Sequence, residues 1–424
     1  MFKKIKHLLY FPIASYFRFF AAIRLRMWNP KVVVITGSSG KTTLLHLVES
    51  QLGDLAKYSH EANSSFGIPF DILGIRRTKL TLDEWPKIFL IPLINVFKAP
   101  PTENIYVVEA DCDRPNEGKF LSHLLKPDIT LWINVARTHS MNFQKLVGDG
   151  KFKTVEEAIA SEFGNFARST KSLVIVNGDS KPILDQIDQI TCNIKTITMK
   201  KNLKKYTVTL SGTKFQTNMG DFDFPYLLPK EIFTSVLMSL NLVNQLGFSR
   251  DAKFSKFRLP PGRNSFFKGI KDTTLVDSSY NANLDSMEAI INMFNQIESK
   301  TKWVVLGDML EQGKFEKEEH EKLASLIAKG RYNKIVLMGP RVTKYTLPKL
   351  INLMPKEVKI EHFMGPKEVL NYLTNSILGD EVILFKGARF LEGVIENLLA
   401  NKADADKLSR REKVWEIRRN KWGL

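Results

Sequence analysis

The chain has 424 residues, of which 43% are hydrophobic and 25% are charged, and this composition excludes a disordered protein, a collagen-like repeat and a disulfide-rich scaffold. The length predicts two or three globular domains, and the only cysteines, Cys112 and Cys192, fit a reducing cytosol. The formal net charge of +17 favours anionic partners. Much of this charge lies at the two chain ends instead of along an aromatic-lined groove, so nucleic acid is not an expected partner.

The first thirty residues are basic, aromatic and free of acid. Seven cations lie in residues 1–31, and the longest uncharged run, residues 7–17, is far shorter than a membrane-spanning helix. Two alternatives stay open for this segment. It could be a helix lying in the interface of an anionic membrane, or a helix packed on the body of the protein. A second apolar run, residues 88–97, is short enough to be expected in the core.

Apolar runs typical of buried strands then alternate with helical stretches, a pattern that predicts parallel α/β sheets. The predicted strands are 31–36, 105–109, 129–134, 173–177, 274–277, 303–307, 334–338 and 381–385, with helices over 287–297 and 317–329. A Pro-Pro-Gly sequence near residue 260 predicts a linker. The expected organisation is an N-terminal segment 1–30, a central domain 31–258, a C-terminal domain 259–400 and a basic tail 401–424.

A glycine-rich loop, Thr-Gly-Ser-Ser-Gly-Lys-Thr-Thr at 36–43, joins the first strand to a helix. Its two glycines allow the backbone to curl so that successive amides face a phosphate. Lys41 offers a charge to the outer phosphates, and the Thr42 hydroxyl can bind Mg²⁺. Ile35 stands where the usual pattern has its first glycine. The predicted ATP-binding residues of the loop are Gly37, Ser38, Ser39, Gly40, Lys41, Thr42 and Thr43.

This short loop resembles that of the Mur ligases, and further motifs similar to that family follow in order. They lie at residues 63–69, 107–110, 134–139, 260–263, 276–283, 306–313 and 386–389. The Tyr-Asn-Ala-Asn and Leu-Gly-Asp-Met-Leu-Glu sequences are most similar to the branch that adds D-alanyl-D-alanine. The resemblance extends from residue 31 to about residue 395.

The resemblance implies a P-loop ATPase domain with a parallel sheet, followed by a Rossmann-like α/β domain. It implies an ATP-dependent, ADP-forming amide ligase that works through an acyl phosphate and adds an amino acid or D-alanyl-D-alanine to a peptidoglycan precursor. ATP and Mg²⁺ are the implied cofactors. Lys41, Glu109 and His139 are the implied catalytic residues, and Thr42, Glu109 and His139 the implied metal ligands. By the same resemblance Arg263, Asp277 and Asn281 contact the nucleotide, and Asn63, Lys386 and Arg389 bind substrate.

The sequence departs from the family pattern at several positions. Only thirty residues precede the first strand, so the family's UDP-sugar domain is expected to be missing. Phe163 stands where a carbamylated lysine is expected, and a phenyl ring cannot bind metal, so the second metal site is incomplete unless a carboxylate such as Glu162 substitutes. Residues 229–235 lack the usual entry motif of the central domain, and Ser278 replaces an aspartate.

Three functions therefore stay open: the ligase described above, a Mur-type ligase for a different, membrane-associated carboxylate, and a non-catalytic ATP-binding protein. The retained Lys41, Thr42, Glu109 and His139 argue against the third. The expected location is the cytoplasm, with peripheral contact to the inner face of the cell membrane, and the chain is expected to be a monomer. His320 lies on a charged helical stretch and is expected to be exposed.

Overall fold

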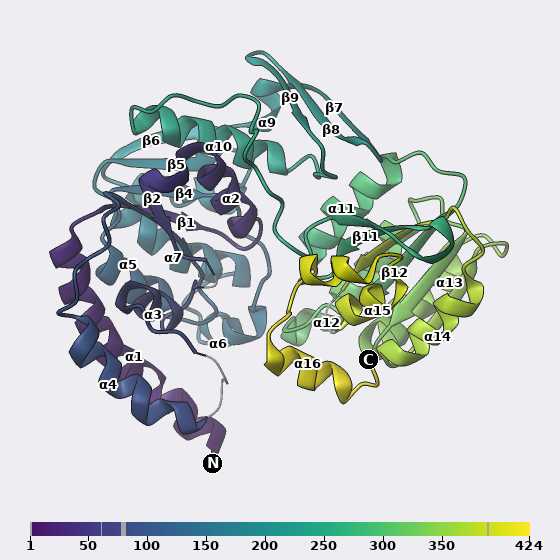
Figure 1. The fold of residues 1–424 in the computed structure, drawn as a ribbon, viewed down its shortest axis with the longest axis horizontal. Coiled ribbons are helices and arrows are strands. Elements are labelled where there is room, and N and C mark those ends of the chain that lie inside the picture. The colour runs from purple at the N-terminus through teal and green to yellow at the C-terminus, as the bar shows by residue number, and fades with distance from the viewer. Residues whose placement is uncertain (1, 61, 78–81, 388–389) are drawn as a thin grey trace. The chain divides into compact units, whose positions relative to one another are not determined.

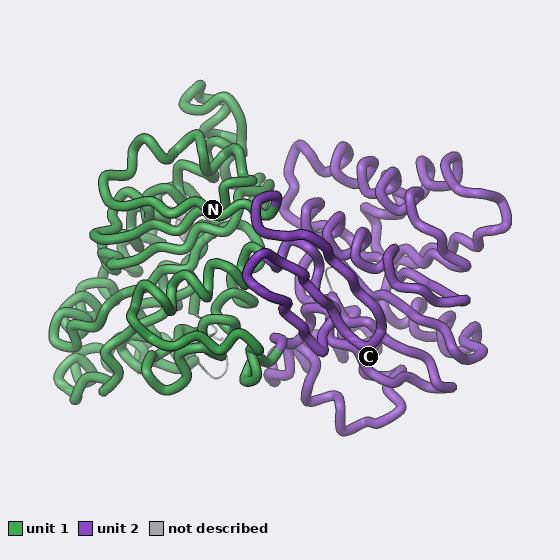
Figure 2. Tube along the Cα trace, turned by 90° about the horizontal axis from the view of Figure 1, so that it is seen from above, with its two compact units in different colours: residues 1–199, 234–258 green, residues 200–233, 259–424 purple. Residues whose placement is uncertain are grey.

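The computed structural model describes residues 2–60, 62–77, 82–387 and 390–424, whose ribbon is drawn in Figure 1. The chain forms two compact units, coloured separately in Figure 2. The first contains residues 1–199 and 234–258, and the second contains residues 200–233 and 259–424. Each unit is built around its own sheet, parallel in the first unit and mainly parallel in the second, so the predicted α/β class is confirmed.

The first unit contains a six-stranded sheet in the order β2-β3-β1-β4-β5-β6, and every neighbouring pair is parallel. Its strands are β1 (Lys31–Thr36), β2 (Ala56–Tyr58), β3 (Ile105–Ala110), β4 (Ile129–Trp132), β5 (Leu173–Asn177) and β6 (Asn193–Ile197). The central strands are buried almost throughout because helices cover both faces of the sheet, and their apolar runs follow from that burial.

The helices that accompany this sheet lie mainly in the crossovers between parallel strands. They are α2 (Lys41–Leu52), α3 (Gly67–Leu73), α4 (Trp85–Asn95), α5 (Glu117–Leu125), α6 (Gln144–Gly148), α7 (Val155–Arg168), α8 (Lys181–Leu184) and α10 (Ile232–Gln245). The short helix α9 (Met199–Asn202) lies where the chain passes to the second unit. Strand β1 leads directly into α2, and the glycine-rich loop is the connection between them. This order places the loop at the carboxyl edge of the sheet, where α/β folds bind ligands.

The N-terminal helix α1 (Phe2–Trp28) packs on the body of the first unit, beside α3, α4 and α5 (Figure 1). Ala14, Phe17 and Ala21 are completely buried on its inner face. Arg24 is also buried and donates hydrogen bonds to the carbonyls of Ile72, Asn95, Lys98 and Ala99, at distances of 2.6–3.0 Å. The inner face of α1 therefore agrees with the second alternative for this segment, a helix packed on the body of the protein.

The expectation that residues 88–97 form core is wrong for half of that run. Helix α4 buries Ile88 and Pro92, and Val96 directly after it is also buried, so the buried positions recur every four residues on one face. The other face exposes large apolar side chains, namely Leu90, Leu93, Ile94 and Phe97. Both faces of this run are apolar, so the sequence does not show which face is buried and which is exposed. Within the described residues, no helix is long and apolar enough to cross a membrane.

The second unit contains a six-stranded sheet in the order β10-β11-β15-β12-β13-β14, antiparallel only between β10 and β11. Its strands are β10 (Ser265–Lys268), β11 (Thr274–Ser278), β12 (Lys302–Gly307), β13 (Lys334–Met338), β14 (Lys359–Phe363) and β15 (Val382–Lys386). Its helices are α11 (Leu284–Gln296), α12 (Glu316–Ile327), α13 (Leu347–Leu353), α14 (Pro366–Ser376), α15 (Leu391–Leu398) and α16 (Lys413–Asn420).

A small antiparallel sheet belongs to the same unit. It consists of β7 (Leu203–Thr209), β8 (Gly212–Thr217) and β9 (Gly220–Phe224). Val208 from β7 and Leu227 beyond β9 are buried in one hydrophobic cluster with Ile291 and Phe294 of α11. This packing explains why residues 200–233 fall in the second unit although the chain returns to the first unit afterwards.

His320 was expected to be exposed, and this is wrong. The imidazole is completely buried on the inner face of α12, where Nε2 accepts a hydrogen bond from the Met309 amide at 3.2 Å and Nδ1 lies 2.7 Å from the Glu316 carbonyl. Burial lowers the pKa of His320. The charged residues of α12 surround His320 in the sequence, at positions 316–322. Composition therefore predicts an exposed histidine, although His320 lies on the buried face of the helix.

Candidate active site

The glycine-rich loop has a backbone that requires its glycines. Gly37 has φ 135°, and a Cβ atom there would lie 2.9 Å from the Asn134 carbonyl oxygen. Gly40 has φ 82° and immediately precedes α2. Both values lie in the region that favours glycine. The resulting turn presents the N-terminus of α2, whose backbone amides and dipole favour an anion.

The two serines of the loop hold it against the segment that follows β4. The Ser38 hydroxyl donates to the Ala136 carbonyl at 3.1 Å and accepts from the Ala136 amide at 2.8 Å. The Ser39 amide donates to Asn134 Oδ1 at 3.0 Å, and Asn134 Nδ2 donates to Ser39 Oγ at 2.9 Å. These bonds fix the shape of the loop, so Ser38 and Ser39 contribute to it through their side chains.

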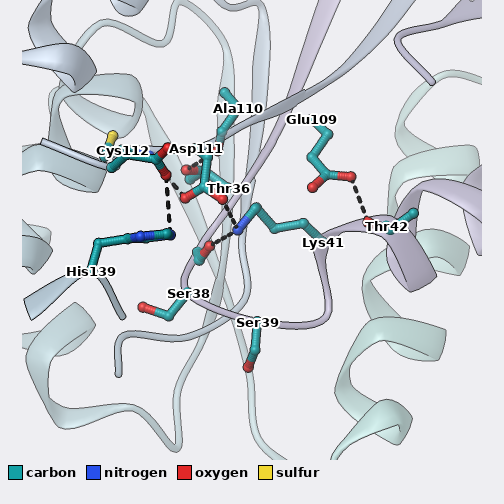
Figure 3. A network of polar contacts seen from close by, with 12 residues as sticks. Thr36, Ser38, Ser39, Lys41, Thr42, Glu109, Ala110, Asp111, Cys112 and His139 are labelled. Carbon is teal, nitrogen blue, oxygen red and sulfur yellow. Dashed lines mark hydrogen bonds and ion pairs between the residues drawn. The ribbon is translucent and has the colours of Figure 1, made fainter. Parts of the chain in front are cut away.

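Lys41 lies at the centre of the site (Figure 3). Its Nζ donates to the Gly37 carbonyl at 2.6 Å and forms an ion pair with Asp111 Oδ2 at 2.8 Å. The side chain is only 6% exposed. Burial alone would lower the pKa of Lys41, but the carboxylates of Asp111 and Glu109 outweigh it and the pKa is raised. Lys41 is therefore a buried, permanently charged cation beside the phosphate loop.

Thr42 and Glu109 form a second contact at the same edge. The Thr42 hydroxyl donates to Glu109 Oε2 at 2.8 Å. Glu109 lies on β3, opposite Ile35 of β1, and its amide donates to the Ser59 hydroxyl at 2.9 Å. A hydroxyl and a carboxylate at hydrogen-bond distance are the hard oxygen ligands that Mg²⁺ prefers, so this pair fits the predicted first metal site.

A further group of metal-binding side chains lies beyond the end of β3. Ligand atoms of Asp111, Asp113 and His139 all lie within 4.8 Å of one another. His139 Nε2 is 3.1 Å from Asp113 Oδ1, and His139 adopts φ 51°. Burial raises the pKa of Asp113 to about 6, although His139 opposes that shift. The sequence motifs indicated His139 but missed both aspartates, whose only signal was their position directly after a parallel strand.

Phe163 and Glu162 lie on α7, and neither adds a free ligand to this group. The Phe163 ring is completely buried. Both Glu162 oxygens accept backbone hydrogen bonds at the start of α5, from Asn116 at 2.6 Å and Gly118 at 3.0 Å. Burial raises the pKa of Glu162. Glu162 therefore accepts backbone hydrogen bonds at the N-terminus of α5. The carboxylates grouped with His139 are those of Asp111 and Asp113, which follow β3.

A buried glutamate, Glu117, joins the loops around this site, and sequence reasoning did not identify it. Its Oε1 accepts hydrogen bonds from the Ser65 amide at 3.1 Å, the Ser65 hydroxyl at 2.7 Å and the Tyr10 hydroxyl at 3.0 Å. Its Oε2 accepts from the Asp113 amide at 3.0 Å. The Asn63 carbonyl accepts from the Asp111 amide at 2.8 Å, so the loop with the predicted substrate residue lies beside the metal-binding group.

In the second unit the predicted residues gather where β11 and β15 end side by side, with Ser278 opposite Lys386. Asp277 is completely buried, and this burial raises its pKa. The buried Lys386 Nζ donates to the Asn281 carbonyl at 3.0 Å. The Arg263 guanidinium lies 4.1 Å from the centre of the Tyr280 ring. Arg389, also predicted to bind substrate, lies outside the described residues.

Lys386 has an unusual charge state for a lysine. Burial, together with the nearby Arg263, lowers its pKa to about 7 against the opposing effect of Asp277. An anion bound next to this amine would favour its protonated form. The end of β15 therefore offers a cation whose charge responds to pH near neutrality.

Comparisons with known proteins agree with the two-unit architecture. Residues 35–230 match the Mur ligase middle domain, and residues 262–389 match the domain described as Mur ligase, glutamate ligase domain. The UDP-N-acetylmuramoyl-tripeptide–D-alanyl-D-alanine ligase of Buchnera aphidicola is 25% identical over 395 residues, which are 88% of this chain and 76% of that protein. The ligase of the same name from Bacillus subtilis is 23% identical over 88% of this chain and 77% of its own length.

Solved structures show the same fold. MurF from Acinetobacter baumannii superposes with a TM-score of 0.70 at 20% identity and covers 91% of this chain and 80% of its own. MurF ligase from Thermotoga maritima, solved in complex with ADP, gives a TM-score of 0.68 at 21% identity and covers 90% and 82% of the two chains. The family matches to residues 35–230 and 262–389 confirm the sequence resemblance for both domains.

Proposed function

The chain belongs to the Mur ligase family, and from this premise we propose that it is an ATP-dependent, ADP-forming ligase that joins D-alanyl-D-alanine, or another amino acid, to the carboxylate of a peptidoglycan precursor. The observation that carries this proposal is the grouping of Lys41, Thr42 and Glu109 at one edge of the sheet, beside a loop shaped for phosphate. The names of the relatives supply the substrate class.

The reaction has two steps. An oxygen of the acceptor carboxylate attacks the γ-phosphorus of ATP and displaces ADP, which gives an acyl phosphate. The amine then attacks the acyl carbon, inorganic phosphate leaves, and the nitrogen loses a proton as the amide forms. Several anionic groups meet at one point in both steps, so positioning and cations carry the catalysis, with no nucleophile from the protein.

The first unit supplies the phosphate-binding elements. Amides at the start of α2 hold the phosphates, and Lys41 exchanges its ion pair with Asp111 for the γ-phosphate. Thr42 and Glu109 would hold a Mg²⁺ ion, which neutralises charge on the phosphates. We assign His139 to a second cation, with Asp113 and Asp111 as its neighbouring carboxylates. These carboxylates provide metal ligands, which the Phe163 ring cannot provide.

The second unit supplies the remaining contacts. Arg263, Asp277 and Asn281 are assigned to the nucleotide, at the strand edge where α/β sheets bind ligands. Lys386 is assigned to the carboxylate of the incoming amino acid, together with Arg389. Asn63 of the first unit is assigned to the acceptor substrate, because its loop is bonded to Asp111.

The pH dependence of amine-substrate binding tests the role of Lys386. A carboxylate binds the protonated amine, and the pKa of Lys386 is lowered to about 7 by burial and by Arg263 against Asp277. We therefore expect KM for the amino-acid substrate to rise above pH 7, by up to about tenfold for each pH unit. The KM of a Lys386→Met variant should be high and independent of pH. A wild-type KM that falls steadily from pH 7 to 9 would contradict the role.

Phosphate release across a substrate panel tests the overall function. The complete chain is given ATP and Mg²⁺ with UDP-N-acetylmuramoyl-tripeptide and D-alanyl-D-alanine, then with each substrate alone and with other amino acids. Release that requires both named substrates is the expected result. Release only with other carboxylates points to a different Mur-type ligase. Tight ATP binding without release from any combination would overturn the enzymatic proposal and favour a non-catalytic protein.

One observation favours the second candidate, a Mur-type ligase for a membrane-associated carboxylate. Helix α4 and the turn after it expose four large apolar side chains, and the N-terminal segment beside them carries no acid. In this alternative the protein works in the cytoplasm, in peripheral contact with the inner face of the cell membrane. The panel distinguishes the two candidates because the soluble precursor would then fail to support release.

A further inference from the structure

Helices α1 and α4 expose an unusual set of large apolar side chains. On α4 the exposed fraction is 60% for Leu90 and 65% for Ile94, and it is 81% for Phe97 in the turn that follows α4. On α1 it is 61% for Phe19. Single exposed apolar residues are ordinary on protein surfaces, but a contiguous group of them marks a site of interaction.

The two helices form one surface because they lie in contact along their length (Figure 1). The Tyr16 hydroxyl of α1 donates to the Phe89 carbonyl of α4 at 2.6 Å, and the two rings lie 5.4 Å apart. Further along both helices, Arg24 donates to the Asn95 carbonyl at 2.6 Å. The inner faces of α1 and α4 thus pack against each other and against the rest of the first unit. We call the outer face, formed by Phe19, Leu90, Leu93, Ile94 and Phe97, the apolar ridge.

Cations predominate around the apolar ridge, although Asp83 and Glu84 directly precede α4 and Glu103 follows residue 102. Residues 1–31 contain seven lysines and arginines and no acid, and residues 85–102 contain Lys87 and Lys98 and no acid. Arg26, Lys87 and Lys98 are exposed. Apolar side chains flanked by cations, without an anion in either segment, complement a surface that is apolar inside and anionic at its boundary.

We propose that the apolar ridge docks on the surface of an anionic phospholipid bilayer, with its apolar side chains at the level of the headgroups and its cations at the lipid phosphates. Within the described residues no helix can span a membrane, so the contact lies in the interface. The sequence had left open a membrane contact by the whole N-terminal segment, but the Phe17 side of α1 is buried in the protein. The contact surface is instead the outer side of both helices.

The same helix α1 also touches the loops of the candidate active site from its inner side. The Tyr10 hydroxyl donates to Glu117, and the Arg114 guanidinium lies 3.7 Å from the centre of the Tyr10 ring. Glu117 in turn binds the backbone of Ser65 and Asp113. A docked α1 would thus lie between the bilayer and the loops that surround the metal-binding group.

Co-sedimentation of the full chain with lipid vesicles tests the proposal. Vesicles of phosphatidylglycerol and phosphatidylcholine are compared with vesicles of phosphatidylcholine alone, at low and high salt. We expect binding to the anionic vesicles that weakens with salt. The double variant Ile94→Glu/Phe97→Glu should bind at least about tenfold more weakly, because it removes two exposed apolar groups and adds two anions.

A matched control is available in the second unit. Ile351 and Leu353 on α13 are exposed to 58% and 47%, so Ile351→Glu/Leu353→Glu makes the same change of charge at two exposed apolar positions elsewhere. This variant should bind vesicles almost as the unsubstituted chain does. Circular dichroism and thermal unfolding should show that both variants are folded, as expected for exposed positions.

Several outcomes would overturn the proposal. Absence of binding to anionic vesicles would do so, as would equal loss of binding in the α4 and α13 variants, which would indicate a general charge effect. A dimer in sedimentation equilibrium that only the α4 variant dissociates would show that a second copy of the chain covers the apolar ridge. None of these outcomes bears on the ligase assay with the soluble precursor, so that proposal fails independently. Absence of vesicle binding would, however, remove the observation that favours a membrane-associated carboxylate.

Discussion

A Lys41→Met variant is expected to lose ATP turnover by at least about a thousandfold, the scale of removing a principal charge from a phosphoryl-transfer site. Lys41 lies beside the phosphate loop as a buried cation, bonded to the Gly37 carbonyl and paired with Asp111. Methionine preserves much of its volume but provides no charge for the γ-phosphate. Phosphate release at saturating ATP measures the effect, and the exposed Lys119→Met serves as the control.

The same substitution should also lower stability, because it leaves the Asp111 carboxylate beside Glu109 and Asp113 without its cation. The expected cost is about 1–3 kcal/mol in the free energy of unfolding, which denaturant titration measures. A double variant, Lys41→Met/Asp111→Asn, removes the unpaired charge and should recover most of this stability. Its turnover should nevertheless stay as low as that of the single variant. Recovery of turnover together with stability would show that Lys41 only maintains the fold.

The sequence predicted the strands that are buried on both faces. The bounds of β1, β5 and β13 are those predicted, because helices cover these strands and their apolar runs are uninterrupted. Strands β6 and β14 were missed. Both are edge strands with mostly exposed or half-exposed residues, so their sequences contain Lys, Thr, Glu and His in place of an apolar run.

The residues of the candidate site likewise divide into those that the sequence predicted and those that it missed. Lys41, Thr42, Glu109 and His139 were predicted because each belongs to a short motif. Asp111, Asp113 and Glu117 were missed, since their importance lies in contacts between segments distant in the sequence, such as the bonds from Glu117 to Ser65 and Tyr10. Such contacts leave no local pattern. The exposure of α4 was missed for the related reason that neighbours, and not composition, decide which apolar face is covered.

The second large effect is expected at Glu109. A Glu109→Gln variant should lower the ligase rate at least about a hundredfold, the scale of losing one strong electrostatic contact in a transition state. Glutamine keeps the size of the side chain and an oxygen that can accept from Thr42, so the fold should be unaffected. The loss should be accompanied by weaker Mn²⁺ binding in electron paramagnetic resonance titrations with ATP present. The exposed Glu357→Gln is the matched control.

The metal-binding group beyond β3 should give a separate signature. His139→Ala and Asp113→Asn should each lower the rate by about a hundredfold or more, on the same electrostatic grounds. Mn²⁺ titration of these two variants should then detect one fewer bound ion per chain. The remaining ions should bind with unchanged affinity, in contrast to the weaker Mn²⁺ binding expected for Glu109→Gln. Bicarbonate should not stimulate activity, because the Phe163 ring cannot form a carbamate. Stimulation by bicarbonate would indicate that a lysine elsewhere completes the second site. Unchanged Mn²⁺ stoichiometry in both variants would remove His139 and Asp113 from it.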